Sequence, residues 1–183
     1  MSASTAHSGT LNAHTDETAL QQKLKRRLVK SQELIKQYAF GSSLTGFIPI
    51  PFLDTVGLIG VQRIMLLHLS KLYDVPFSRN AAGIILSSLM GGVASRAAAP
   101  FASSALKLLP GVGTAISGTS MATMSAASTY AVGKIFQQHF EQGGTLENFN
   151  LEQAKSELNN KMQEGQQAYK SYKKQSKINS ITK

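Results

Sequence analysis

Residues Leu108–Gly133 read LLPGVGTAISGTSMATMSAASTYAVG, and this stretch decides the fold of the chain. It carries no ionisable side chain apart from Tyr130 and is crowded with Gly, Ala, Ser and Thr. At about 1.5 Å per helical residue it is long enough to cross the roughly 30 Å hydrocarbon core of a bilayer. Its small residues equally suit close packing in the middle of a helical core. Both alternatives make it a packing element, because it offers no nucleophile–base pair, metal cluster or phosphate loop.

Small residues form a row within this stretch. Gly118, Ala122 and Ala126 recur every four residues, so on a helix they lie on one face and allow a second helix to approach closely. The preceding segment, 79–106, is also largely uncharged and rich in small residues. We therefore expect an all-α domain of about five helices, in which a central hydrophobic, small-residue-rich hairpin from Arg79 to Phe140 is flanked by amphipathic helices.

A basic amphipathic helix is expected near the N-terminus, beginning after Thr15–Asp16 and ending near Gly41. Its apolar residues recur at steps of three and four: Leu20, Leu24, Leu28, Ile35 and Tyr38. Five basic residues decorate the rest of its surface: Lys23, Lys25, Arg26, Arg27 and Lys30. Such a helix is either the solvated outer face of a packed element or a surface that lies on an anionic membrane or partner.

Turn signals separate the next elements. Pro49 and Pro51 predict a sharp turn, because each proline fixes φ and removes a backbone donor. Asp54 stands just ahead of the apolar run 56–72 and is best explained as an N-cap or first-turn acid. A catalytic or ion-binding role for Asp54 is the weaker alternative.

The later helices also have recognisable ends. Residues 74–77 end the second helix, Ser78 is placed to cap the third, and Gly143–Gly144 predicts the stop of the fourth. A last amphipathic helix has apolar or small residues at steps of three and four: Leu151, Ala154, Leu158, Met162, Gly165, Tyr169 and Tyr172. Packing on its own domain is the first explanation for this face, and binding a partner is the second.

Composition bounds the function. The chain has 183 residues, a net charge of +9 and no cysteine, so disulfides and thiolate metal sites are excluded. Basic charge is densest in the flanks, with six basic against three acidic residues in 1–40 and seven against three in 151–183. We expect a disordered polar tail over 1–15, a single helical domain over 16–172 and a basic tail over 173–183. The polar N-terminus lacks a secretory signal, which favours a cytoplasmic protein or one inserted from the cytoplasmic side.

Catalytic and cofactor motifs are missing from the sequence. No GxxxxGK[ST] motif occurs, so the chain alone is not a P-loop GTPase. The four histidines are scattered without the spacing of a zinc site, and the basic residues are not interleaved with aromatics as nucleic-acid binding requires. We therefore expect no enzyme activity, no cofactor, no metal and no nucleic-acid partner.

Three blocks of the chain, taken together, resemble a known family. They are GFIPIPFLD (46–54) with KLYDVPFS (71–78), then KLLPGVGTAISG (107–118) with STYAVGKIFQQHFEQGGTLENFN (128–150), and finally EGQQAY (164–169). They are similar to the bacterial YcjF-type domain of unknown function, whose members are fused to, or encoded beside, Era-like and dynamin-like GTPases. The positions carried over are expected to be structural: Pro49, Pro51, Asp54, Pro76, Pro110, Gly111, Gly113, Gly133, Gly143 and Gly144.

The resemblance implies an all-helical, membrane-associated domain without catalytic activity. Its expected role is an accessory or anchor for a GTPase in trans, with membrane lipid, a separately encoded GTPase and further copies of itself as partners. The expected location is the cytoplasmic side of the bacterial inner membrane, multi-pass or deeply associated, with a cytoplasmic location as the alternative. Two rival functions stay open, namely a soluble helical protein that binds an apolar ligand or lipid in its core, and an enzyme of a kind that no motif reveals.

Overall fold

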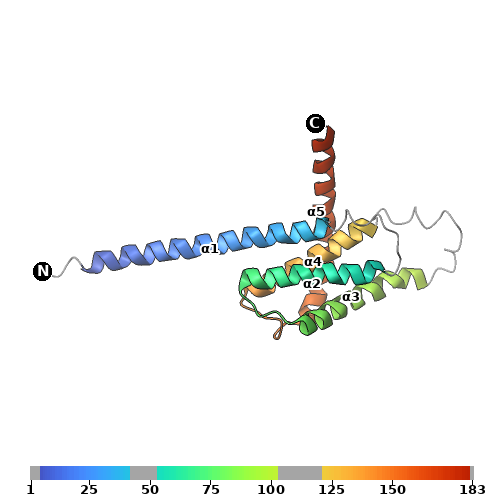
Figure 1. Ribbon diagram of the computed structural model, residues 1–183, viewed down its shortest axis with the longest axis horizontal. Helices are drawn as coiled ribbons and strands as arrows, with labels where there is room; N and C mark the ends of the chain where they lie inside the picture. Colours follow the sequence, from blue (N-terminus) through green and yellow to red (C-terminus); the bar gives the residue numbers. More distant parts are fainter. Residues whose placement is uncertain (1–4, 42–52, 103–120, 182–183) are drawn as a thin grey trace.

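The computed structural model describes residues 5–41, 53–102 and 121–181, and within them the side-chain environment of 17–41, 57–91 and 123–181. This part of the chain forms five helices and no strand (Figure 1). The helices are α1 (Thr5–Gly41), α2 (Leu53–Tyr73), α3 (Arg79–Ala102), α4 (Met121–Glu141) and α5 (Leu151–Ile181). The predicted all-α fold with about five helices is confirmed.

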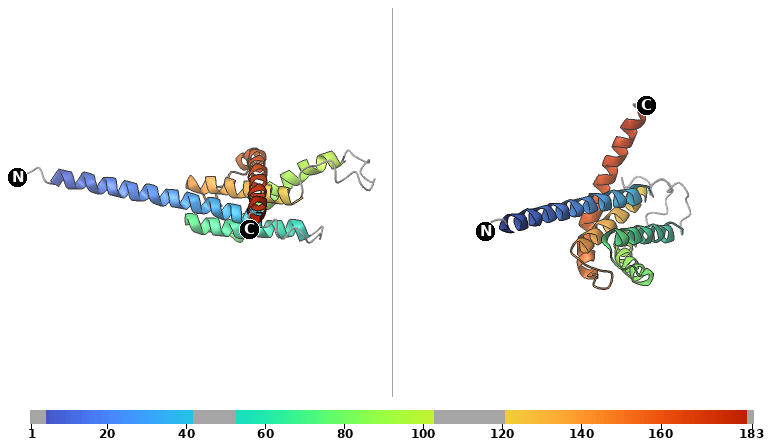
Figure 2. Two further views of the ribbon diagram at one scale, coloured as in Figure 1. Left: turned by 90° about the horizontal axis from the view of Figure 1, so that it is seen from above. Right: turned by 60° about the vertical axis from the view of Figure 1, so that its left-hand side comes forward.

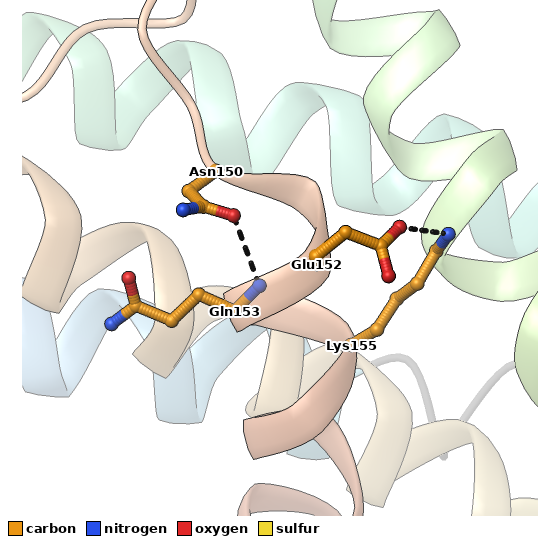
Figure 3. Close-up of polar contacts among 4 residues, drawn as sticks. All are labelled: Asn150, Glu152, Gln153 and Lys155. Carbon is orange, nitrogen blue, oxygen red and sulfur yellow. Dashed lines mark hydrogen bonds and ion pairs between the residues drawn. The ribbon is translucent and has the colours of Figure 1, made fainter.

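Two helices, α3 and α5, begin at side-chain caps. Asn150 Oδ1 accepts a hydrogen bond from the backbone N–H of Gln153 at 3.0 Å and so caps α5 (Figure 3). In the same first turn, Glu152 lies near the positive end of the helix dipole and pairs with Lys155 at 2.8 Å. Ser78 caps α3 as predicted, because its Oγ accepts a backbone N–H in the first turn.

Two helices end in a left-handed residue. Gly143, with φ of 79°, follows the end of α4, and the N–H of Gly144 donates to the carbonyl of His139 at 2.9 Å. This is the Schellman arrangement, which satisfies carbonyls that the helix leaves unpaired. Asp74 takes the same role after α2 with φ of 58°, a conformation that Asp tolerates better than most residues with a Cβ.

Helix α4 lies at the centre of the body. Helices α1, α2 and α4 run side by side, and each contacts the other two (Figure 2). Helix α5 crosses α4, and α3 packs against α2 and α5. The largest fully buried side chains come from α1, α2, α3 and α4: Ile35, Gln62, Met65, Leu66, Leu69, Leu86, Leu89, Val132, Phe136 and Gln137.

The small-residue face of α4 meets α1 and α5. Ala126 is fully buried in a cluster with Phe40 of α1 and Tyr169 of α5. A Cβ placed on Gly165 of α5 would lie 2.9 Å from Cα and from the carbonyl oxygen of Ala127, so these two backbones touch. The sequence predicted the preceding helix as the partner of this face. Gly118 and the side chains of Ala122 and of 92–102 lie outside the described residues, so that contact stays a prediction. Small residues permit a close approach, but they do not specify which helix makes it.

Two helices extend beyond the body as arms. Helix α1 begins at Thr5, earlier than the predicted start after Thr15–Asp16, and its first half projects away from the other helices (Figure 1). Helix α5 continues through Ile181, past the end predicted near Tyr172. Neither arm contains a proline, so nothing in these segments forces the helix to stop.

The predicted membrane span falls partly outside the described residues. Residues 108–120 of that stretch are not described, and neither is the side chain of Ala122. Among the helices in the described ranges, none combines the length and apolarity that crossing a bilayer requires. Spanning by 108–133 therefore stays a prediction.

Candidate functional site

The exposed half of α1 carries an apolar stripe that lacks cover. Leu20, Leu24 and Leu28 are 56%, 49% and 38% exposed. The same helical face continues into Ser31 and Ile35, which are fully buried against the body. One stripe is therefore core for half of its length and surface for the other half, and large exposed apolar areas of this kind mark interaction sites.

Basic residues surround this stripe, and four of the five predicted ones are exposed. They are Lys23, Lys25, Arg26 and Lys30. With the leucines they form a basic amphipathic surface, which we call the α1 arm surface. The nearest acidic residues along the helix, Glu17 and Glu33, lie outside the basic cluster. The arm surface therefore has a positive potential.

Arg27 differs from the other four because it holds α1 to the body. Its Nη2 lies 3.2 Å from Asp74 Oδ2, and its guanidinium carbon lies 5.5 Å from the centre of the Tyr73 ring. The Asp74 side chain is 82% exposed, so the ion pair contributes only about 0–1 kcal/mol. Its main effect is geometric, since it sets where α1 crosses the end of α2.

A cleft of about 520 Å³ lies where the arm leaves the body. Residues from α1, the end of α2 and the end of α4 line it: Gln21, Gln22, Leu24, Lys25, Arg27, Leu28, Tyr73, Phe140 and Glu141. The lining is amphipathic, because leucine and aromatic side chains alternate with two cations and one carboxylate. The volume falls within the range of about 300–1,000 Å³ that is typical of small-molecule sites.

A chain of hydrogen bonds joins three helices beside this cleft. Ser31 Oγ of α1 accepts from Tyr73 Oη of α2 at 3.0 Å and from Gln137 Nε2 of α4 at 2.7 Å. Lys134 Nζ donates to Gln137 Oε1 at 2.8 Å. The Tyr73 hydroxyl also lies 2.9 Å from Glu141 Oε1, so its proton is shared between two acceptors. These bonds hold the buried half of α1 in register with α2 and α4.

The titration properties of this network favour binding over proton transfer. Burial, together with the hydrogen bond and the charge of Glu141, raises the pKa of Tyr73 to about 12. Burial also lowers the pKa of Lys134. A general acid or base works best with a pKa near the working pH, so a phenol with a pKa of about 12 serves as a neutral hydrogen-bond donor.

The predicted family positions are spread over the body. A Cβ at Gly133 would lie 2.8 Å from Ile35 Cγ1 and 3.2 Å from Met65 Sδ, so Gly133 allows α1 and α2 to approach α4. Gly144 lies against the His139 ring. Asp54 lies in the first turn of α2. The remaining predicted positions outside the described residues are Pro49, Pro51, Pro110, Gly111, Gly113 and Gly118.

Pro76 lies exposed in the connection between α2 and α3. The structure does not bring the described family positions together, since they occupy separate turns and helix contacts. Tyr73, Asp74 and Glu141, which do meet near the arm, were not singled out from the sequence. The only local signal is that each stands at the end of an apolar helix; their meeting depends on the tertiary fold.

Comparisons with known proteins give one family and one relative. A family model described as "Domain of unknown function (DUF697)" matches residues 11–167. The protein named "Magnetosome membrane protein 22" from Magnetospirillum gryphiswaldense is 34% identical over 122 residues, which are 66% of this chain and 62% of that protein. The match therefore leaves more than a third of the relative's length without a counterpart. No solved structure matches the chain.

Proposed function

This chain belongs to the DUF697 family, and from that premise we propose that it is a non-catalytic domain that associates with membranes. In this proposal the α1 arm surface lies on an anionic bilayer while the helical body stays attached to it. The relative from Magnetospirillum gryphiswaldense is named a membrane protein, which supports the assignment. The proposed location is the cytoplasmic side of the bacterial inner membrane.

The observation that carries the proposal is the uncovered apolar stripe on the arm. Leu20, Leu24 and Leu28 are large, exposed and aligned, and basic residues flank them. A helix of this composition lies in the plane of a membrane interface, with its apolar face in the boundary between headgroups and acyl chains. Each basic residue near an anionic surface adds roughly 1 kcal/mol of attraction.

Charge favours a lipid surface over a second copy of the arm. Two arms that packed stripe to stripe would bring their basic residues together, and the whole chain already carries a net charge of +9. Like charges at close range oppose association. An anionic bilayer instead satisfies the leucines and the cations at once.

A fluorescent label on the arm tests the proposal directly. The chain has no cysteine, so Gln21→Cys creates a unique attachment site at the edge of the leucine stripe for an environment-sensitive dye. We expect a blue shift of the emission when the full chain meets vesicles of phosphatidylcholine with phosphatidylglycerol, and little shift with phosphatidylcholine alone. The same dye at Ser156→Cys, an exposed position on the packed half of α5, should not respond.

Charge-neutral variants provide the second measurement. Glutamine at Lys23, Lys25, Arg26 and Lys30 should weaken binding to the anionic vesicles at least about tenfold, because four surface charges are lost. The matched control carries glutamine at Lys36, Lys71, Lys155 and Lys161, which removes the same net charge from the body. An equal loss in both variants, or a dye at residue 21 that does not respond, contradicts the assignment to α1.

A GTPase partner in trans is the finer part of the proposal. It rests on the resemblance to YcjF-type domains, because nothing on the described surface specifies such a partner. The measurement is recruitment of an Era-like or dynamin-like GTPase from the same bacterium to vesicles that already carry this chain. Recruitment should require the chain, and equal GTPase binding to bare vesicles would contradict the proposal.

The cleft beside the arm supports a second candidate function, the binding of a free amphiphile. Its apolar wall of Leu24, Leu28 and Phe140 suits an acyl chain, while Lys25 and Arg27 suit an acidic headgroup. Under this alternative a soluble fatty acid should bind with one-to-one stoichiometry in the absence of vesicles. Leu28→Gln should abolish that binding. If the arm binds only bilayer surfaces, the free fatty acid should show no saturable binding to the protein.

A further inference from the structure

The C-terminal arm of α5, residues 170–181, is helical and exposed. The last buried residue is Tyr169, and every residue from Lys170 to Ile181 is exposed. The arm leaves the body close to the end of α1 (Figure 1). There the rings of Phe40 and Tyr172 stack with 5.0 Å between their centres. Its helix therefore persists without support from a core.

Lysines on this arm form one stripe. They are Lys170, Lys173, Lys174 and Lys177. Their spacing of i, i+3, i+4 and i+7 places all four within about 100° of the helix circumference at 3.6 residues per turn. No acidic residue occurs from Gly165 to the end of the chain, so this positive stripe is not neutralised along its own helix.

The packed half of the same helix is built differently. There Lys155 pairs with Glu152 at 2.8 Å, and Lys161 pairs with Glu164 at 3.0 Å. Lysines three or four residues apart without acids between them repel one another and weaken the helix. The helix dipole favours cations only in the last turn, and Lys170 and Lys173 lie well before Ile181. The arm therefore has a charge pattern that an external anionic partner would stabilise.

We propose that this lysine stripe is a second contact with an anionic lipid surface. Ile178 and Ile181 lie beside or within the stripe and are 54% and 76% exposed. Aliphatic side chains among lysines suit the boundary between headgroups and acyl chains. Such aliphatic side chains add little to the binding of a nucleic-acid backbone, which depends mainly on cations that neutralise its phosphates.

This inference extends the proposed membrane function but uses residues that α1 does not share. Two arms on one body make the second contact intramolecular once the first has formed. Binding then exceeds what either arm achieves alone. Loss of one arm should weaken attachment strongly without abolishing it.

A permuted variant separates the stripe from mere net charge. Lys173→Gln with Gln175→Lys, together with Lys177→Asn and Asn179→Lys, moves two lysines to the opposite side of the helix while composition stays constant. We expect the permuted full chain to bind phosphatidylcholine–phosphatidylglycerol vesicles several-fold more weakly than the wild type. Glutamine at all four lysines should cost at least about tenfold, since each lysine near the surface contributes about fivefold.

Site-specific labels keep the two arms distinguishable. A dye at Ser180→Cys, next to the stripe, should shift with anionic vesicles, and the dye at Gln21→Cys reports α1 independently. A response at residue 180 alone supports this inference and overturns the α1 assignment. A response at residue 21 alone does the reverse. The cooperative melt of the body, followed by circular dichroism, should be unchanged in these variants, because no altered side chain is buried.

Two outcomes overturn the lipid assignment for α5. One is equal vesicle affinity of the wild type and the permuted chain. The other is tighter binding to duplex DNA than to anionic vesicles at the same ionic strength, with the permuted variant impaired on DNA only. The second result would assign the stripe to a nucleic-acid backbone instead.

Discussion

Two buried glutamines show that the contribution of a polar side chain to stability depends on its hydrogen-bond partners. Gln137 is 2% exposed, and its amide bonds to Ser31 through nitrogen and to Lys134 through oxygen. Gln62 is fully buried, and neither atom of its amide has a hydrogen-bond partner in the part of the chain that the structure describes. A buried polar group without a partner costs about 1–3 kcal/mol.

Replacement by methionine, which has nearly the same shape, should therefore have opposite effects at the two positions. Gln62→Met should raise the free energy of unfolding by about 1–2 kcal/mol, because an unpaired amide leaves the core. Gln137→Met should lower the free energy of unfolding by a similar amount, since Lys134 loses its acceptor and Ser31 loses one of its two donors. Urea denaturation of both variants measures this, and a loss of stability in both would contradict the explanation.

Sequence reasoning does not separate these two residues. Each interrupts an apolar helix, and the bond that distinguishes Gln137 joins it to Ser31, which lies 106 positions away. Arg27 is a similar case, because it belongs to the predicted basic group but pairs with Asp74 across the fold. The local sequence pattern identified the basic surface. Only the tertiary contacts show that Arg27 holds α1 to the body while the other four basic residues are exposed.

At the scale of elements, the contact between α1 and α4 depends on the missing side chain of Gly133. A Cβ there would lie 2.8 Å and 2.9 Å from the two γ carbons of Ile35, and these cannot move far in a packed core. Gly133→Ala should lower the free energy of unfolding by about 1–2 kcal/mol even though alanine favours the helix. Gly60→Ala is the matched control on α2. Nothing lies within 4 Å of a Cβ at that position, so it should be neutral or stabilising.

A double variant checks the cause. Ile35→Ala alone should cost roughly 2–5 kcal/mol as a large-to-small change in the core. If steric conflict with Ile35 explains the cost of Gly133→Ala, the double variant should be more stable than the sum of the two single effects. If the two single effects simply add in thermal melts of the double variant, steric conflict with Ile35 is not the cause of the Gly133→Ala destabilisation.

Periodicity predicts the buried faces of helices, and it does not by itself predict their neighbours. The predicted stripe of α5 is confirmed at Ala154, Leu158, Met162, Gly165 and Tyr169, all of which are buried. The predicted contact of the α4 small-residue face with the preceding helix stays a prediction, because Gly118 and the side chain of Ala122 lie outside the described residues. Apolar spacing reports which side of a helix is buried, but the choice among four other helices depends on how large side chains fit together in three dimensions.

At the scale of the whole molecule, a body carries two arms of lower stability. Backbone that lacks buried contacts opens more readily, and proteases cleave such segments first. The first cuts by trypsin should therefore fall within 23–30 and 170–177, before cuts at the basic residues packed on the body, such as Lys134. Mass spectrometry of early fragments measures this order.

Anionic vesicles should slow both sets of early cuts, and neutral vesicles should not. First cleavage at Lys134 with intact arms would contradict the division into body and arms. The sequence indicated this division only in part. It placed dense charge in both flanks and predicted a basic tail over 173–183, where the structure has a helix through Ile181. Composition shows where the charges lie, but it does not show whether a charged helix packs against the rest of the protein.

Helix α1 is packed along its second half and exposed along its first, where the exposed ion pair of Arg27 with Asp74 is a weak tether, so the helix has its pivot near Ser31. The exposed segment 17–30 is about 21 Å long at 1.5 Å per residue. A rotation of about 10° at the pivot therefore displaces the far end by about 4 Å. Conversely, a displacement of Leu20 sideways rotates α1 at the hydrogen-bonded contact of Ser31, Tyr73 and Gln137. The position of the arm and the packing of the body are therefore coupled at this contact.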